Sequence, residues 1–552
     1  MPKNPNVTVM IPKRSAFDWS HHNLLSQTCG TIVPIFSQEV IPGTKINQKI
    51  ALSVTMPPLV SDTYMRCSYK VCAFFVPYRL LFGGYQNWFN QYTGPSVAGG
   101  ASGNQIDTPS PYLPYLNLTG TSTSTAKWLG PGTLFDYLGG KATSSTSTHY
   151  FECNIFPFLA YHKIYEDFFR ASQVQKPCFA PPRYNVDWPD SHSYNVAMLP
   201  YLNTPRGGAA IYGWLDETTS DKMEQLKLAD GVSLLSLRQA NFGFDYFTNA
   251  WPAATQPSMS VSSSSSFTIE ALRSANSLQQ FSERLQISGY KFADNIAARY
   301  GANLKDYIAS KSVFLGSADY EVYSKGVNLT NVTPTSTTSA ATKNPYYESP
   351  AARYGNAFGS GSDFLIKGFE VNEPGIIMVT GVFVPRVTYG SGLRKYLRRY
   401  TSGTSGSIMD MANPQVQNVG NEPIFAYELH TGSVWSTPGS IFGYSDRFAS
   451  WMTMEDELHG NFTSGGSLQY FALQRTFAST PSLNSAFLEI PKAYMDDITT
   501  YVSSSNPWAC WVDVDFDCKV LMPLYRYSMP SLQDPAYEHG RPVSVRRGGF
   551  RF

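Results

Sequence analysis

Residues 44–55 carry the longest alternation of apolar and polar side chains in the chain. A period of two over twelve residues is typical of an antiparallel strand with one buried face. A turn signal, Pro42-Gly43, precedes it. The apolar face holds Ile46, Ile50, Leu52 and Val54, interrupted only by Gln48.

Four further segments have strand character. Tyr64–Val76 is rich in aromatic and β-branched residues and stops at a proline, as does Ile376–Val384. Trp511–Val520 alternates strictly, with valine, phenylalanine and cysteine on one face and aspartate and lysine on the other. Thr31–Val40 is a weaker candidate.

Helical spacing of apolar residues is rarer. It predicts helices over Phe156–Ser172, Ile269–Ile287 and Ala293–Tyr300. His162 falls on the aromatic face of the first helix, where we expect a hydrogen-bonded packing residue rather than a ligand.

The predicted strands lie far apart in the sequence, and the stretches between them are rich in Gly, Ser, Thr and Pro. No charged or proline-rich linker divides the chain. This pattern favours a single, mainly β domain over residues 1–552, an antiparallel β-sandwich with a few short helices and long loop insertions. We expect the insertions at about residues 93–154, 173–237, 317–365 and 401–470, and extended basic termini at 1–20 and 541–552.

Charged residues make up only 15% of the chain and aromatic residues 14%, and 42 Lys and Arg against 41 Asp and Glu leave a net charge of +1. Disorder and a globally polybasic nucleic-acid binder are therefore excluded. No apolar run approaches the length of about 20 residues that a membrane-spanning helix needs. One interpretation is a secreted, lectin-like exterior. The other is burial of much of the surface against further subunits, since interface cores are poor in charge and rich in Tyr, Phe, Trp and Met.

The seven cysteines fit no disulfide framework, and the first residues contain no apolar segment of the kind that signals secretion. We expect free thiols and synthesis in a reducing cytoplasm. Nucleotide-binding and hydrolase motifs are absent from the sequence, and the eight histidines are scattered. The sequence thus predicts no enzyme and no cofactor.

Carboxylates at alternate positions of the last predicted strand are the best candidates for a catalytic or metal site. These are Asp513, Asp515 and Asp517. The Cα atoms of successive members would lie about 6.8 Å apart along the strand. The carboxylates could hold Ca²⁺ or supply the acid and base of a glycosidase. The simpler interpretation, which we favour, is the polar outer face of a strand.

Basic residues gather at the two ends of the chain and in one internal cluster. The C-terminal tail combines arginines with Gly and Phe, a composition suited to phosphate contact and base stacking. The internal cluster is Arg394, Lys395, Arg398 and Arg399, and it calls for a counter-anion if helical. We predict nucleic-acid contact by the terminal residues Arg541, Arg546, Arg547 and Arg551, and then by Lys3, Lys13 and Arg14.

Short motifs follow one another from residue 15 to about residue 530. They include Ser15-Ala-Phe-Asp-Trp-Ser-His21, Phe74-Phe-Val-Pro-Tyr-Arg79, Phe156–Arg170, Asp245–Pro252 and Arg526–Pro530. In this order they resemble the major capsid proteins of microviruses, small icosahedral phages with single-stranded DNA, and in particular the gokushovirus-like group.

The resemblance implies an eight-stranded antiparallel jelly roll, a T=1 icosahedral capsid of about sixty copies and a circular single-stranded DNA genome inside it. It also implies a location in the virion, synthesis in the cytoplasm of a bacterial host, and partners. These are a small DNA-binding protein, a DNA pilot protein, an internal scaffold and a host cell-surface receptor, for which a glycan is one candidate. The alternative function is a secreted carbohydrate-binding or glycoside-hydrolysing β-sandwich.

Overall fold

The computed structural model describes most of the predicted strands. The described residues are 14–59, 63–82, 115–120, 127–140, 149–179, 201–202, 211–212, 228–253, 311–330, 352–398, 421–430, 440–496, 498–499 and 510–524, except 229, 447, 478 and 480, together with the isolated residues 85, 89, 273 and 277. The helix predicted over Ala293–Tyr300 lies outside this set, and the one over Ile269–Ile287 does so almost entirely.

One antiparallel sheet of nine strands dominates the described residues, in the order β1-β15-β4-β11-β10-β5-β12-β3, with β2 also paired to β15. The predicted mainly β antiparallel fold is confirmed, and the short strand β1 brings the number above the expected eight. The strands are β1 (Ser15–Asp18), β2 (His21–Gln27), β3 (Ile32–Val40), β4 (Lys45–Thr55), β5 (Cys67–Pro77), β10 (Val313–Thr330), β11 (Ala352–Glu370), β12 (Gly375–Pro385) and β15 (Cys510–Met522).

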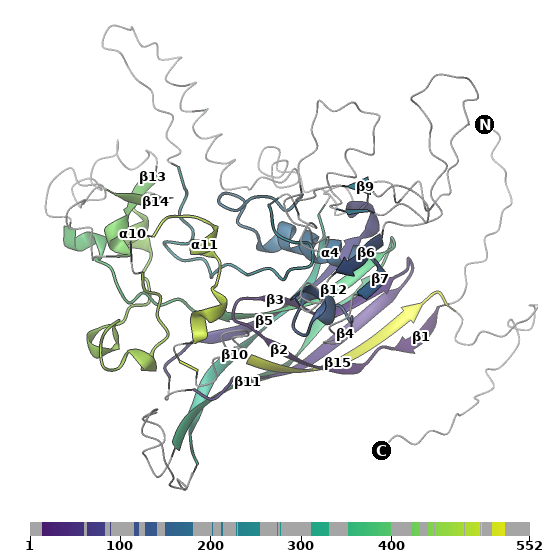
Figure 1. Ribbon diagram of the computed structural model, residues 1–552, viewed down its shortest axis with the longest axis horizontal. Helices are drawn as coiled ribbons and strands as arrows, with labels where there is room; N and C mark the ends of the chain where they lie inside the picture. Colours follow the sequence, from purple (N-terminus) through teal and green to yellow (C-terminus); the bar gives the residue numbers. More distant parts are fainter. Residues whose placement is uncertain are drawn as a thin grey trace, which may run out of the picture.

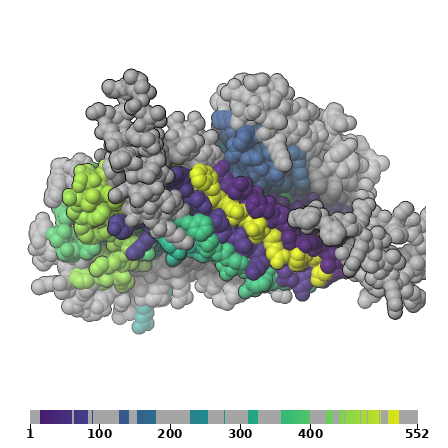
Figure 2. Space-filling view, turned by 90° about the horizontal axis from the view of Figure 1, so that it is seen from below, coloured from purple at the N-terminus to yellow at the C-terminus, as the bar shows by residue number. Residues whose placement is uncertain are grey.

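The sheet curls because β10 changes partner along its length. Residues 313–322 pair with β5, whereas residues 323–330 pair with β11. The resulting curl is visible in Figure 1, where α4 (Phe156–Ile164) lies on one side of the sheet. On the opposite face every second residue of β15 is exposed, and Figure 2 shows β15 in yellow between purple strands.

The expectation of an insertion over residues 317–365 is wrong for much of its length, because most of β10 and the first part of β11 fall within it. Their many glycines resemble a loop in the sequence, but the structure gives them another role. A Cβ at Gly361 would lie 2.4 Å from the Tyr320 ring, and one at Gly359 would lie 2.5 Å from the Glu321 carbonyl oxygen. Glycine is needed here because the two strands approach closely.

Alternation on the predicted strands is confirmed. In β15 every second residue from Cys510 to Met522 is buried, and in β4 the buried set includes Gln48. β15, from the end of the chain, lies between β4 on one side and β1 and β2 on the other, all from its beginning. Completion of this half of the sheet therefore requires both ends of the described chain.

The smaller elements surround this sheet. Three two-stranded pairs are β6 (Tyr115–Gly120) with β7 (His149–Asn154), β8 (Tyr201–Leu202) with β9 (Ile211–Tyr212), and β13 (Asn421–Phe425) with β14 (Ile441–Asp446). The other α-helices described are α3 (Leu134–Tyr137), α10 (Ala449–Met452) and α11 (Ser485–Leu488), and a π-helical turn, η2 (Tyr165–Phe169), extends α4. None of the described helices has the length and apolar character needed to cross a bilayer.

His162 on α4 is a packing residue, as predicted. Its side chain is fully buried, with Nε2 2.8 Å from the Leu234 carbonyl oxygen, and its Nδ1 accepts a hydrogen bond of 3.0 Å from Arg238 Nε. Burial, together with the Arg238 charge, lowers the pKa of His162 well below its usual value, so the ring stays neutral. Arg238 in turn pairs with Asp230.

All seven cysteines are free, as predicted, and five of them are buried. Burial raises the pKa of Cys67 and of Cys518 to about 12. These thiols are therefore protonated at neutral pH and weakly reactive. The fold is held by packing and hydrogen bonds rather than by covalent links between its segments.

Gln27 joins three segments of the main core. Its Nε2 donates to the carbonyl oxygens of Gly381 at 3.0 Å and Thr31 at 2.5 Å, and its Oε1 accepts from the Tyr69 hydroxyl at 2.9 Å. The substitution Gln27→Ala leaves these buried groups without partners. We expect it to lower the free energy of unfolding by about 2–5 kcal/mol.

Urea unfolding, monitored by tryptophan fluorescence, measures this change in the free energy of unfolding. Gln38→Ala is the matched control, because Gln38 is exposed and should stay within about 0.5 kcal/mol of the wild type. Equal unfolding midpoints for the two variants would contradict the role given to Gln27.

Candidate functional site

The two basic ends of the chain leave the described body at neighbouring points. Ser15, the first residue of β1, is paired in register with Met522, the last residue of β15. Arg14 is the one predicted nucleic-acid contact within the described residues, and it forms an ion pair with Glu370 of β11. The other predicted contacts, Lys3, Lys13, Arg541, Arg546, Arg547 and Arg551, lie outside the described residues.

The aspartates of β15 lie on its exposed face, which agrees with the simpler interpretation. Asp513 pairs with His22 of β2, and Asp517 lies 3.3 Å from Lys519. Among the described residues, no group of three or more His, Cys, Asp or Glu side chains could hold a metal ion. Asp513, Asp515 and Asp517 thus form part of a polar strand face.

Besides Asp517, Lys519 also pairs with a carboxylate of β1 on this face. Its Nζ donates to Asp18 of β1 at 2.7 Å. Hydrogen bonds from Lys519 and from Ser20 hold the pKa of Asp18 well below its usual value. β1 and β15 are therefore joined by side-chain charge as well as by backbone pairing.

The internal basic cluster finds its counter-anions within the chain. Residues Lys395–Arg398 form a short 3₁₀ helix, η3. Arg394 pairs with Glu457, and Lys395, 3% exposed, pairs with Glu422. Lys395 Nζ also donates to the Pro423 carbonyl oxygen at 2.7 Å. The prediction of a counter-anion is confirmed for Arg394 and Lys395, whereas Arg398 lies over the Tyr427 ring and Arg399 lies outside the described residues. Lys395 holds β13 rather than facing solvent.

A second buried carboxylate lies near this ion pair. Glu428 accepts a hydrogen bond of 2.8 Å from the Phe425 backbone N–H. Burial raises its pKa to about 7, against a smaller opposing effect of the Lys395 charge. One buried ammonium thus faces two buried carboxylates, and at neutral pH one of them is partly protonated.

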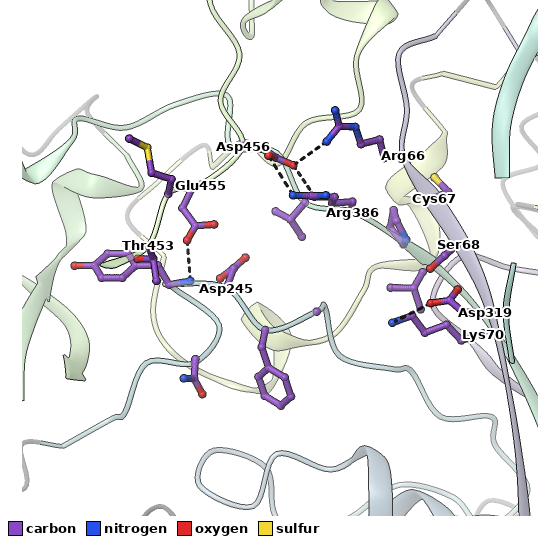
Figure 3. Close-up of a pocket in the computed structure, with 18 of the residues that line it drawn as sticks. Arg66, Cys67, Ser68, Lys70, Asp245, Asp319, Arg386, Thr453, Glu455 and Asp456 are labelled. Atoms are coloured by element: carbon purple, nitrogen blue, oxygen red, sulfur yellow. Dashed lines mark hydrogen bonds and ion pairs between the residues drawn. The ribbon is translucent and has the colours of Figure 1, made fainter. Parts of the chain in front are cut away.

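A cavity of about 1080 Å³ lies where the main sheet meets a second, smaller hydrophobic cluster, which includes Phe247, Ile424 and Phe487. Figure 3 shows it with side chains that project from both sides. The sheet contributes the start of β5, the middle of β10 and the end of β12. The other side is formed by residues 243–251 and 445–456.

Ion pairs and hydrogen bonds cross or line this cavity. Asp456 Oδ2 is 2.6 Å from Arg386 Nε and 4.0 Å from Arg66 Nη1, and Lys70 lies 3.8 Å from Asp319 (Figure 3). Glu455 accepts from the Tyr246 backbone N–H at 2.9 Å. Most of these groups are paired with one another, which suits a brace between the two hydrophobic clusters better than a catalytic centre.

Large apolar side chains lie exposed in the lining of this cavity. Phe244 is 92% exposed, Met454 84% and Met452 74%. Exposed aromatic and methionine side chains gathered in one place are typical of a surface that another protein covers. Sequence reasoning missed this surface, because its residues come from segments that only the fold brings together.

Comparison with known proteins identifies the family of this chain. A family model described as a capsid protein, the F protein, matches residues 6–532. The chain belongs to this capsid protein family. It is a structural protein of the virion and forms the capsid.

Curated relatives cover nearly the whole chain. The capsid protein VP1 of Bdellovibrio phage phiMH2K is 25% identical over 491 residues, which is 83% of this chain and 84% of that protein. VP1 of Chlamydia phage 1 is 22% identical over 621 residues, covering 96% and 97%. VP1 of Spiroplasma virus 4 is 22% identical over 584 residues, covering 94% and 95%. The resemblance to microvirus capsid proteins is confirmed, and nothing supports the carbohydrate-active alternative.

The raised pKa of Glu428 predicts a pH-dependent stability of the capsid protein. Since this pKa is higher in the folded chain than the ordinary 4.5, the folded state binds the extra proton. The stabilisation is complete below about pH 4.5 and is lost as the pH rises to about 7, a difference on the order of 3 kcal/mol. Glu428→Gln, which resembles the protonated form, should remove this dependence and stabilise the protein at pH 8.

Thermal unfolding of both proteins from pH 5 to pH 8 checks this prediction. The two melting temperatures should agree at pH 5 and diverge at pH 8, with the variant higher. Glu321→Gln, at an exposed position, is the control and should follow the wild type. A variant that melts below the wild type at pH 8 would contradict the prediction.

Proposed function

We propose that about sixty copies of this capsid protein close into a T=1 icosahedral shell around a circular single-stranded DNA genome. The low charge content of the chain and the exposed Phe244, Met452 and Met454 support extensive contact between copies. In this proposal the protein acts by assembly, and it carries no catalytic site.

The observation that carries the DNA part of the proposal is the pairing of Ser15 with Met522. Because of this pairing, the segment before Ser15 and the segment after Met522 both join the sheet at the same edge. Lys3, Lys13 and Arg14 precede Ser15 in the sequence, and Arg541, Arg546, Arg547 and Arg551 follow Met522. A local excess of this kind can neutralise packaged phosphates although the whole chain is nearly neutral.

Further components complete the proposed particle. They are a small DNA-binding protein, a DNA pilot protein and an internal scaffold, with a host cell-surface receptor, for which a glycan is one candidate, as an outside partner. The protein would be made in the cytoplasm of a bacterial host. Support for these components comes from the family alone.

Truncation of the tail tests the role in DNA contact. Removal of Ser544–Phe552 deletes three of the four tail arginines. We expect particles that still assemble from about sixty subunits but that hold less DNA. Particle mass and the ratio of absorbance at 260 and 280 nm measure the two quantities separately.

A chain of full length with the three arginines replaced by lysine is the matched control and should keep most of its DNA, since the phosphate contacts depend mainly on charge. Truncated particles with unchanged DNA content would disprove contact by the tail. A wild-type protein that stays a 61.2 kDa monomer under all conditions would disprove the shell itself.

A further inference from the structure

Phe364 of β11 is exposed on the open face of the main sheet. Its side chain is 60% exposed. Two lysines lie beside the ring, with Lys49 Nζ 5.7 Å and Lys367 Nζ 6.0 Å from the ring centroid. A large apolar ring in this position adds nothing to the hydrophobic core, which lies on the other face of the sheet.

An irregularity in β11 creates this arrangement. In a regular strand, residues 364 and 367 would point to opposite faces. The register shifts on both sides of Ile366, so that Leu365 and Ile366 are both buried while Phe364 and Lys367 are both exposed. Such bulges redirect side chains and are frequent next to functional sites.

Local contacts hold this irregularity in place. Gly368 adopts a positive φ of 62°, and its N–H donates to Asn47 Oδ1 at 2.6 Å. Lys49 is paired in register with Phe364 and is exposed on the same face as Asn47. β4 and β11 thus present the ring and both lysines together.

The lysines here differ from the other basic groups on this face. Arg14, His22 and Lys519 each pair with a carboxylate. Lys45, Lys49 and Lys367, in contrast, form no ion pair with any described residue. Three carboxylates lie close in the sequence or register. Asp363 precedes Phe364, Asp517 is opposite Lys49 but contacts Lys519, and Glu370 is opposite Lys45 but pairs with Arg14.

We propose that Phe364, Lys49 and Lys367, with Lys45 at the margin, form a binding site for single-stranded DNA. A base would stack on the Phe364 ring and the ammonium groups would contact the flanking phosphates, the combination by which proteins bind single strands without sequence preference. At 5.7–6.0 Å the ammonium groups lie at the limit of cation–π attraction, so a base can take their place over the ring. This inference rests on the proposed DNA genome.

The position of the site agrees with that proposal. Lys45 is paired in register with Leu521 of β15 and with Glu370 of β11, the partner of Arg14. The site is therefore continuous with the edge from which both basic ends leave. One strand of DNA could contact the tail and the sheet together.

Two measurements test the site. In the first, intact wild-type particles are irradiated with ultraviolet light and digested, and peptides carrying nucleotides are found by mass spectrometry. The peptide that contains Phe364 should carry a nucleotide. In the second, the purified protein is titrated with a fluorescent thymidine oligonucleotide of about 20 nucleotides at several salt concentrations.

The variants separate stacking from charge. Phe364→Leu should weaken oligonucleotide binding about fivefold or more, whereas Phe89→Leu, at a phenylalanine that is also 60% exposed, should leave it unchanged. The pair Lys49→Gln and Lys367→Gln should reduce the slope of log K against log salt by about 1.4. Lys70→Gln, which removes a lysine already paired with Asp319, is the control.

The outcomes distinguish this inference from the proposed function. If wild-type particles contain DNA but Phe364→Leu binds the oligonucleotide as the wild type does and its peptide is not cross-linked, the site is disproved and the proposed function stands. If Phe364→Leu blocks assembly without changing binding by the subunit, the face is a contact between copies and the inference is also overturned. If wild-type particles contain no DNA, the proposed function fails.

Discussion

The curl of the main sheet is the constraint on which the other features depend. It arises where β10 leaves β5 and joins β11, and the strands can approach there because Gly359 and Gly361 have no side chain. The curl encloses the main core under α4, leaves the opposite face open, and places the end of β12 beside the second hydrophobic cluster. The cavity and the exposed lysine and phenylalanine face are both consequences of this bend.

The scarcity of charge has a second cause besides contact between copies. Several of the few charged side chains are buried in ion pairs inside the fold. Lys395 pairs with Glu422, and Arg238 pairs with Asp230. Removing one partner of such a pair would leave a buried charge, which is strongly unfavourable. The surface is therefore even poorer in charge than the composition suggests. Lys45, Lys49 and Lys367, which form no ion pair within the described part of the chain, lie on this charge-poor surface.

Alternation predicted β4 and β15, which have one buried face, and helical spacing predicted the helix with His162. β5 and β12, which are buried along most of their length, were predicted from their β-branched and aromatic residues, and β3 was a weaker candidate. Periodicity missed β10 and β11, since their glycines serve close strand contact yet look like loop residues. It could not predict the cavity, because Arg66, Asp245, Asp319 and Asp456 meet only through tertiary structure. Of the predicted DNA contacts only Arg14 lies within the described residues, so the terminal site stays a prediction.

The central place of β15 has a consequence for how the protein is made. β15 begins at Cys510, yet it completes the hydrogen bonding of β1, β2 and β4, which a ribosome releases at the start. A nascent chain must therefore hold an unfinished sheet until the ribosome has released residues 510–522. A chain that ends before Cys510 lacks β15 and leaves this edge of β4 unpaired, so the described sheet cannot be completed.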